Sequence, residues 1–257
     1  LGTGYRHIML VKGGSGMTVE CTPPHDIIGQ PIERHMPRGE DEELFRKLML
    51  DSAAVFAGHE VNRRRELAGK RPATMIWLWG QGKRPSMPTF HDLYGMTGAA
   101  ISAVDLICGM AKCAGLSVVE VPGATGYFDT NYAGKGSYGV DALERGDFLF
   151  VHVEAPDEAG HVGDVEEKIR AIENFDKWVV GPIAEGISSS KQHRVMVLPD
   201  HLTPISVRTH VGDPVPYLVW GTGIAPGRAS GFTESEAGKS GTFIEKGFEL
   251  LPGYLKG

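Results

Sequence analysis

The chain has 257 residues, with 26 Lys and Arg against 32 Asp and Glu and a formal net charge of −6 at pH 7. Its 41% hydrophobic and 23% charged residues are typical of a folded globular protein and exclude an intrinsically disordered chain. The acidic balance argues against nucleic-acid binding, because contact with phosphate backbones requires a basic surface.

Short apolar runs alternate with helical patterns along the chain. Apolar residues at helical spacing predict one helix around 44–56 and another from 165 to about 187. Strands that alternate with helices indicate βαβ units and a mostly parallel sheet with flanking helices, which is an α/β fold. The expected strands are 8–11, 75–79, 117–121, 148–153, 195–198 and 217–220.

The stretch 71–88 is rich in glycine and proline around one expected strand. Such punctuation is typical of a hinge between two parts of a chain. We therefore place a domain boundary near residue 73, with residues 1–73 and 74–257 on its two sides.

Three cysteines, Cys21, Cys108 and Cys113, form neither a disulfide framework nor a CxxC metal pair. Sparse thiols in odd number favour a reducing compartment, so we expect a cytoplasmic protein. No apolar run approaches the roughly 20 residues that cross a bilayer, and basic residues interrupt any signal-peptide core. We expect no membrane partner.

Two glycine-rich segments look like phosphate-binding loops but do not meet their requirements. No helical pattern follows the segment 12–16, which lacks the dinucleotide-binding spacing. A P-loop that ends at 238–240 would need a glycine where Thr233 stands. We therefore expect no nucleotide cofactor.

Acidic and imidazole side chains follow the expected strands in the last hundred residues. Asp157 and His161 come after one strand, Asp200 and His201 directly after the next, and His210 precedes the last. Carboxyl ends of parallel strands share one sheet edge, where these groups can meet. Mixed oxygen and nitrogen ligands suit Mn²⁺, Zn²⁺ or Fe. The alternative is that each aspartate caps a turn and each histidine is a surface residue.

These motifs resemble a known family. The segments HVEAPDEAGHVGD (152–164), PDH (199–201) and RTHVGDPVP (208–216) resemble the alkaline-phosphatase-like metalloenzymes, most closely the archaeal type of cofactor-independent phosphoglycerate mutase. Some relatives carry a homoserine kinase label. The resemblance extends upstream through CTPPHDIIGQPI (21–32), HEVNRRRELAGKRPA (59–73), IWLWGQG (76–82), GAAISAVDL (98–106) and VPGATGYFDTNY (121–132).

The resemblance implies two divalent metal ions, with Mn²⁺ expected and Zn²⁺, Co²⁺ or Mg²⁺ as alternatives. It assigns Asp157, His161 and His210 to the first ion, and Asp200 and His201 to the second. In the family, the second site also needs an Asp and a nucleophilic Ser or Thr from an N-terminal strand that precedes the first matching motif. We expect this chain to be an inactive C-terminal fragment without its nucleophile; the other reading is a natural protein that has lost it.

The resemblance also implies an isomerase of glycolysis that interconverts 3-phosphoglycerate and 2-phosphoglycerate through a phosphoserine intermediate. Residues 1–73 would be the C-terminal part of an inserted phosphotransfer domain, and residues 74–257 the metal-binding core without its N-terminal strand. A metal-dependent phosphohydrolase on the same core is the alternative. Side chains suited to binding the phosphate and carboxylate of a phosphorylated acid are Arg6, His25, Asn62 and Arg65.

Overall fold

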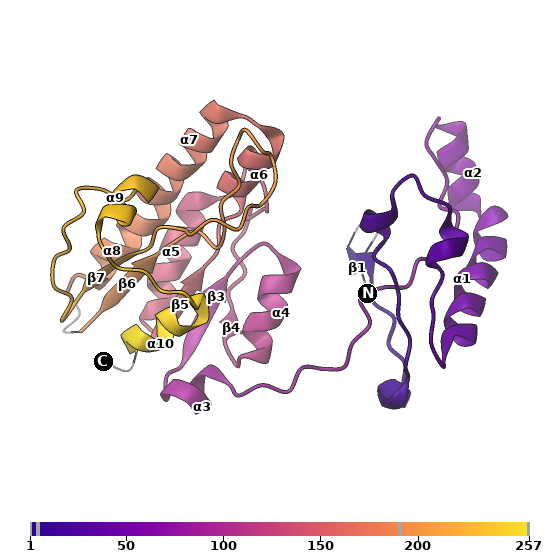
Figure 1. The fold of residues 1–257 in the computed structure, drawn as a ribbon, viewed down its shortest axis with the longest axis horizontal. Coiled ribbons are helices and arrows are strands. Elements are labelled where there is room, and N and C mark those ends of the chain that lie inside the picture. The colour runs from indigo at the N-terminus through magenta and orange to yellow at the C-terminus, as the bar shows by residue number, and fades with distance from the viewer. Residues whose placement is uncertain (1, 4–5, 190–191, 256–257) are drawn as a thin grey trace. The chain divides into compact units, whose positions relative to one another are not determined.

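The computed structural model describes residues 2–3, 6–189 and 192–255. The chain forms two compact units, Leu1–Pro85 and Ser86–Gly257 (Figure 1). Within the described residues, no helix combines the length and the apolar composition that crossing a membrane requires.

The first unit is built around two helices, α1 (Glu42–Ala57) and α2 (Glu60–Leu67). The helix expected around 44–56 is therefore confirmed. The expected strand at 8–11 is wrong, because these residues are irregular and the side chains of Ile8 and Leu10 are mostly exposed. The remaining elements are the paired strands β1 (Gly2–Thr3) and β2 (Arg6–His7) and the 3₁₀ turns η1 (Gly14–Gly16), η2 (Pro24–Ile27) and η3 (Ile32–His35).

The chain from 70 to 89 contains neither helix nor strand, so the strand expected at 75–79 is absent. Its polar groups bond to the first unit instead. The backbone N–H of Ile76 donates to a serine hydroxyl of α1 at 2.9 Å. The side chains of Trp77 and Gln81 donate to backbone carbonyls at 2.8 and 3.0 Å. These bonds join residues 76–81 to the rest of the first unit, beyond the boundary expected near residue 73.

Asn62 anchors the start of this segment. Its side chain is 7% exposed. Its amide donates to the carbonyls of Phe56 and Ala73 at 2.8 and 2.6 Å and accepts from the N–H of Ala73 at 2.8 Å. Asn62→Ala should lower the free energy of unfolding by about 1–3 kcal/mol, because buried backbone groups lose their partners. Urea denaturation measures this loss, and the exposed Arg63→Ala on the same helix should change little. Equal effects of the two variants would contradict the anchoring role.

The second unit contains a parallel sheet. Its strands are ordered β4 (Ser117–Val118), β3 (Gly98–Ile101), β5 (Phe148–Val151). Helix α4 (Asp105–Cys113) connects β3 to β4, and α5 (Tyr132–Leu143) lies between β4 and β5 in the chain. Parallel strands need such crossover connections. The expected α/β fold is confirmed.

Two further strands of this unit, β6 (Arg194–Val197) and β7 (Leu218–Gly221), pair antiparallel. This pair departs from the parallel arrangement expected for most of the sheet, because the connection 198–217 contains no helix of the kind that a parallel crossover needs. Among the described residues, β5 pairs with β3 alone and β6 with β7 alone. Each of the two strands therefore has one edge without a strand partner in this part of the chain.

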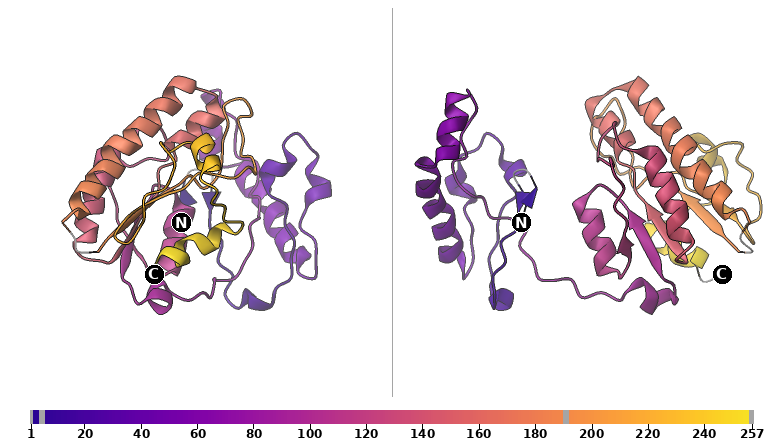
Figure 2. Two further views of the ribbon diagram at one scale, coloured as in Figure 1. Left: turned by 60° about the vertical axis from the view of Figure 1, so that its left-hand side comes forward. Right: turned by 180° about the vertical axis from the view of Figure 1, so that it is seen from behind.

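Helices flank these strands. Helix α6 (Ala155–Val162) follows β5, and α7 (Val165–Phe175) continues through the π turn η4 (Asp176–Val180) into α8 (Gly181–Ile187). Figure 2 shows α7, η4 and α8 as one long continuous helix, as the pattern at 165–187 predicts. We call these three elements together the rod. Helix α5 packs against the second half of this rod. The shorter elements are α3 (Phe90–Tyr94), α9 (Glu234–Lys239), η5 (Gly247–Glu249) and α10 (Leu250–Leu255).

A cluster of buried apolar side chains lies between α5, α6 and the rod. It consists of Tyr132, Ala155, Ala171 and Val179, with partly buried apolar neighbours that include Val151 of β5. Small alanines allow the helices to approach closely. The cluster fixes α6 against the carboxyl end of β5, and α6 carries the first acid–imidazole pair.

Candidate metal centre

Asp157 and His161 both lie on α6, one turn apart and therefore on the same face. Proline in the first turn and Gly163 in the left-handed region just after the end (φ 81°) delimit this helix. The carboxylate of Asp157 lies in the first turn, where the helix dipole favours negative charge. His161 Nε2 is 3.2 Å from Asp157 Oδ2.

His210 reaches the same point from the loop 198–217. Its Nε2 atom is 3.4 Å from Asp157 Oδ1 and 3.1 Å from His161 Nε2. One possible ligand atom from each of these three residues lies within 4.8 Å of the other two. One carboxylate oxygen and two imidazole nitrogens form a donor set that suits Zn²⁺ or Mn²⁺. The residues that the structure brings together therefore fit a divalent metal ion.

Arg208 orients His161 through its backbone. The carbonyl of Arg208 lies 3.1 Å from His161 Nδ1, so this nitrogen donates and Nε2 is left free for a ligand role. Arg208 has φ 59°, the single positive value for a non-glycine residue in the described part of the chain. Such a conformation costs about 1–3 kcal/mol and is typical of functional sites. Nothing in the sequence pattern indicates this role.

The second pair of expected ligands lies beside the first set. His201 Nε2 is 3.4 Å from Asp200 Oδ2, and His201 Nδ1 is 3.9 Å from Asp157 Oδ1. The imidazole rings of His201 and His210 stack, with centroids 3.7 Å apart. All five predicted metal ligands thus gather in one cluster, formed by α6 and the loop 198–217.

A buried lysine and a partly buried glutamate lie near this cluster. Lys135 is 1% exposed and donates to the carbonyl of His152 at 3.0 Å. Burial lowers the pKa of Lys135, and the nearby Glu154 carboxylate opposes this effect. Burial also raises the pKa of Glu154, with a further increase from the neighbouring carboxylates of Glu158 and Asp157. These residues were not predicted from the sequence, since an isolated lysine in a glycine-rich helix gives no signal.

The lowered pKa of Lys135 makes stability depend on pH. Between its folded pKa and the ordinary value of about 10.5, the unfolded chain binds the extra proton, so the free energy of unfolding rises with pH. In Lys135→Met, the free energy of unfolding should lose this contribution to its rise with pH. In Lys112→Met, a change at an exposed lysine, the contribution should remain. Urea midpoints from about pH 8 to 10 provide the measurement. Parallel slopes for both variants would show that Lys135 does not contribute.

The predicted substrate-binding residues belong to the first unit. The amide of Asn62 is occupied by backbone groups, and Arg65 Nε donates to the carbonyl of Arg71 at 2.8 Å. The side chains of Arg6 and His25 lie outside the described part of the structure. Substrate binding by these four residues stays a prediction.

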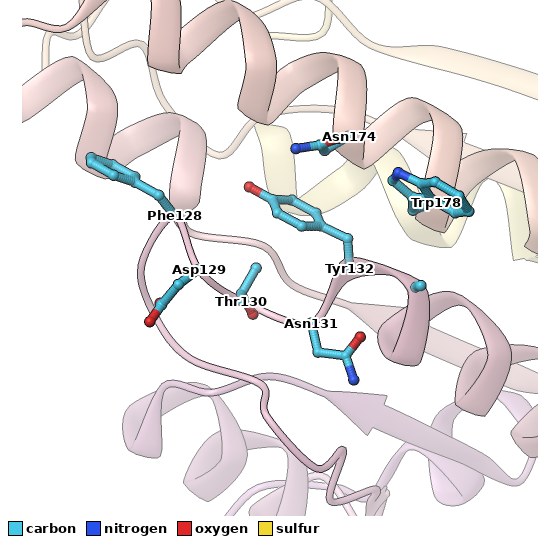
Figure 3. A pocket seen from close by; sticks show the side chains of 8 residues that line it. Phe128, Asp129, Thr130, Asn131, Tyr132, Asn174 and Trp178 are labelled. Atoms are coloured by element: carbon cyan, nitrogen blue, oxygen red, sulfur yellow. The ribbon is translucent and has the colours of Figure 1, made fainter.

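A shallow hollow of about 350 Å³ lies at the start of α5. Figure 3 shows side chains of the preceding loop and of the rod around it. None of the five predicted metal ligands lines it. The lining residues are Phe128, Asp129, Thr130, Asn131, Tyr132, Ala133, Asn174 and Trp178.

The family to which the chain is similar is consistent with a set of metal-binding side chains. A family model described as the metalloenzyme superfamily matches residues 11–246. The chain belongs to the metalloenzyme superfamily. Membership implies binding of divalent metal.

The chain is 54% identical over 234 residues to 2,3-bisphosphoglycerate-independent phosphoglycerate mutase 2 of Methanothermobacter thermautotrophicus, covering 91% of the chain and 58% of the relative. It is 50% identical over 251 residues to the 2,3-bisphosphoglycerate-independent phosphoglycerate mutase of Methanothrix thermoacetophila. This match covers 97% of the chain and 64% of the relative. The resemblance of its motifs to this family is confirmed. The chain thus spans about three fifths of the length of these relatives.

Two solved structures share the fold. The PH0037 protein from Pyrococcus horikoshii matches with a TM-score of 0.71 and 32% identity, over 77% of this chain and 52% of that one. The cofactor-independent phosphoglycerate mutase from Thermoplasma acidophilum matches with a TM-score of 0.58 and 23% identity, over 93% and 59%. The second likeness supports the fold alone.

Proposed function

We propose that this chain belongs to a metal-dependent phosphoglycerate mutase that interconverts 3-phosphoglycerate and 2-phosphoglycerate. The convergence of Asp157, His161 and His210, which are distant in sequence, is the observation that carries the proposal. The names of the relatives with about 50% identity support the reaction and the substrate.

The chain's own residues have distinct tasks in this proposal. Asp157, His161 and His210 hold the first ion, and Asp200 and His201 contribute to the second. Bound divalent ions would supply positive charge that stabilises a transferring phosphoryl group. We propose Mn²⁺ as the ion, because carboxylate and imidazole ligands suit it and no thiolate lies in the donor set.

The second set offers two donors in the described part of the chain, fewer than a divalent ion needs from a protein. We infer that a further strand completes the core and brings the remaining carboxylate and the nucleophile. Among the residues that the structure describes, one edge of β5 and one edge of β6 have no strand partner. This supports the inference, because an inserted strand would satisfy their backbone groups. Residues 1–73 then belong to an inserted phosphotransfer domain, as the motif resemblance implies.

An assay of the natural full-length protein with 3-phosphoglycerate tests the proposal. The expected product is 2-phosphoglycerate without free phosphate, with the activity lost in EDTA and restored by Mn²⁺. Release of free phosphate would instead indicate a phosphohydrolase on the same core. No turnover of any kind in Mn²⁺, Zn²⁺, Co²⁺ or Mg²⁺ would contradict both activities.

A further inference from the structure

We propose that Thr203 is a positioning residue whose single hydroxyl fixes both the orientation of the Asp157 carboxylate and the tautomer of His201. The inference rests on the metal-binding roles proposed for these two residues. It links the first ligand set to the second through one hydrogen-bonding group.

The geometry places the Thr203 hydroxyl between the two sets. Thr203 follows β6 and is 4% exposed. Its Oγ1 atom bonds to Asp157 Oδ1 and lies 3.2 Å from His201 Nδ1. Both contacts are made by the same oxygen atom, so one substitution removes both.

The hydrogen count then determines the direction of each bond. A threonine hydroxyl has one proton and two acceptor lone pairs, whereas an ionised carboxylate only accepts. Thr203 therefore donates its proton to Asp157, and Oγ1 can only accept from His201. A neutral His201 ring must carry its proton on Nδ1 and leave a lone pair on Nε2.

This tautomer directs His201 Nε2 toward a ligand role. The atom lies 3.4 Å from Asp200 Oδ2, which also bears lone pairs. Two acceptors side by side repel each other and are complementary to a cation. Meanwhile the bond from Thr203 fixes Oδ1 of Asp157, and Oδ2 stays 3.2 Å from His161 Nε2. Thr203 thus prepares a ligand atom in each set.

The backbone around Thr203 keeps its hydroxyl in place. Lys168 Nζ, on α7, donates to the carbonyl of Thr203 at 2.6 Å. Gly160 of α6 lies directly against the same residue, since a Cβ atom there would be 2.5 Å from the Thr203 carbonyl oxygen. The hydroxyl is therefore held by α6 and α7, not by its own loop alone.

Nitrogen-15 NMR of histidine-labelled, metal-free protein tests the tautomer directly. Spectra at about pH 8, above the ordinary imidazole pKa of about 6.5, report which ring nitrogen carries the proton. We expect His201 protonated on Nδ1 in the wild type and in Thr203→Ser, and a shift toward protonation on Nε2 in Thr203→Val. Thr130→Val is the matched control, because Thr130 is a buried threonine of the same unit, 6% exposed, whose hydroxyl contacts none of the ligands.

Calorimetric titration with Mn²⁺ provides the second readout. Thr203→Val should weaken binding by about 10–100-fold, the usual effect of removing a partner of a metal ligand. Thr203→Ser and Thr130→Val should stay near the wild-type affinity. A wild-type protein that binds no Mn²⁺ would refute the proposed metal role, and the tautomer measurement would still decide the role of Thr203.

Two results would overturn the inference. One is a wild-type His201 protonated on Nε2, which needs no variant to observe. The other is a folded Thr203→Val protein with the wild-type tautomer. If Thr203→Val does not fold, the wild-type tautomer and the retention of tautomer and affinity in Thr203→Ser decide the question.

Discussion

Asp157→Asn is expected to weaken binding of Mn²⁺ or Zn²⁺ to this chain by more than about 100-fold. Changes to the partners of a metal ligand already cost 10–100-fold, and here a ligand itself loses its charge. The first set contains one carboxylate and two imidazoles, so the variant leaves the ion with no negative ligand among them. Asparagine also keeps only one side-chain oxygen, so an amide NH₂ group replaces one of the two oxygens that lie 3.2 and 3.4 Å from the imidazole Nε2 atoms.

Titration calorimetry measures the effect, with Asp141→Asn as the matched control because that aspartate is exposed on α5. His210→Ala should resemble Asp157→Asn. His201→Ala should have a much smaller effect, since this residue belongs to the second set. Wild-type metal affinity in Asp157→Asn would show that the Asp157 carboxylate is not a metal ligand.

Gly160→Ala should damage both stability and metal binding. The added Cβ would lie 2.5 Å from the carbonyl oxygen of Thr203 and 2.8 Å from its Cγ2, so α6 and the loop 198–217 must move apart. Overpacking of this kind costs about 1–3 kcal/mol in the free energy of unfolding. Because α6 carries Asp157 and His161 and the loop carries His210, the same movement separates the ligands.

The matched control for this variant is Gly238→Ala. Gly238 lies in α9, and a Cβ atom there would have no neighbour within 4 Å. Alanine is the better helix former by about 1 kcal/mol, so this variant should be neutral or slightly more stable. Urea denaturation and Mn²⁺ titration of both proteins give the comparison. A Gly160→Ala protein as stable as the wild type would show that α6 and the loop are not in tight contact.

Elements with a clear apolar period were predictable from the sequence. The long rod at 165–187 follows from the spacing of its apolar residues, and the strands near 148–153, 195–198 and 217–220 follow from short apolar runs. The apolar runs at 8–11 and 75–79 did not become strands, because a run indicates apolar character and not a pairing partner.

Helix α6 and strand β3 (Gly98–Ile101) gave the weakest signals. Both are built from small residues such as alanine and glycine, which pack closely without producing a strong hydrophobic period. Helix α6 was still detectable by its ends, since a proline lies in its first turn and a glycine follows its last residue.

The proposed ligands could be selected from the sequence by type and order, but the groups that orient them could not. Asp157, His161 and His210 recur in chemically suggestive motifs after the expected strands. Thr203 acts through the position of one hydroxyl, and Arg208 through a backbone carbonyl in an unusual conformation. Such roles depend on how the loop folds back on α6, which residue identity does not encode locally.

Anomalous diffraction from crystals of the protein grown with Mn²⁺ is the direct test of metal binding at this site. We expect a manganese peak within bonding distance of an Asp157 carboxylate oxygen and of Nε2 of His161 and His210. A manganese ion bound elsewhere, with these three side chains bound to no metal, would contradict it.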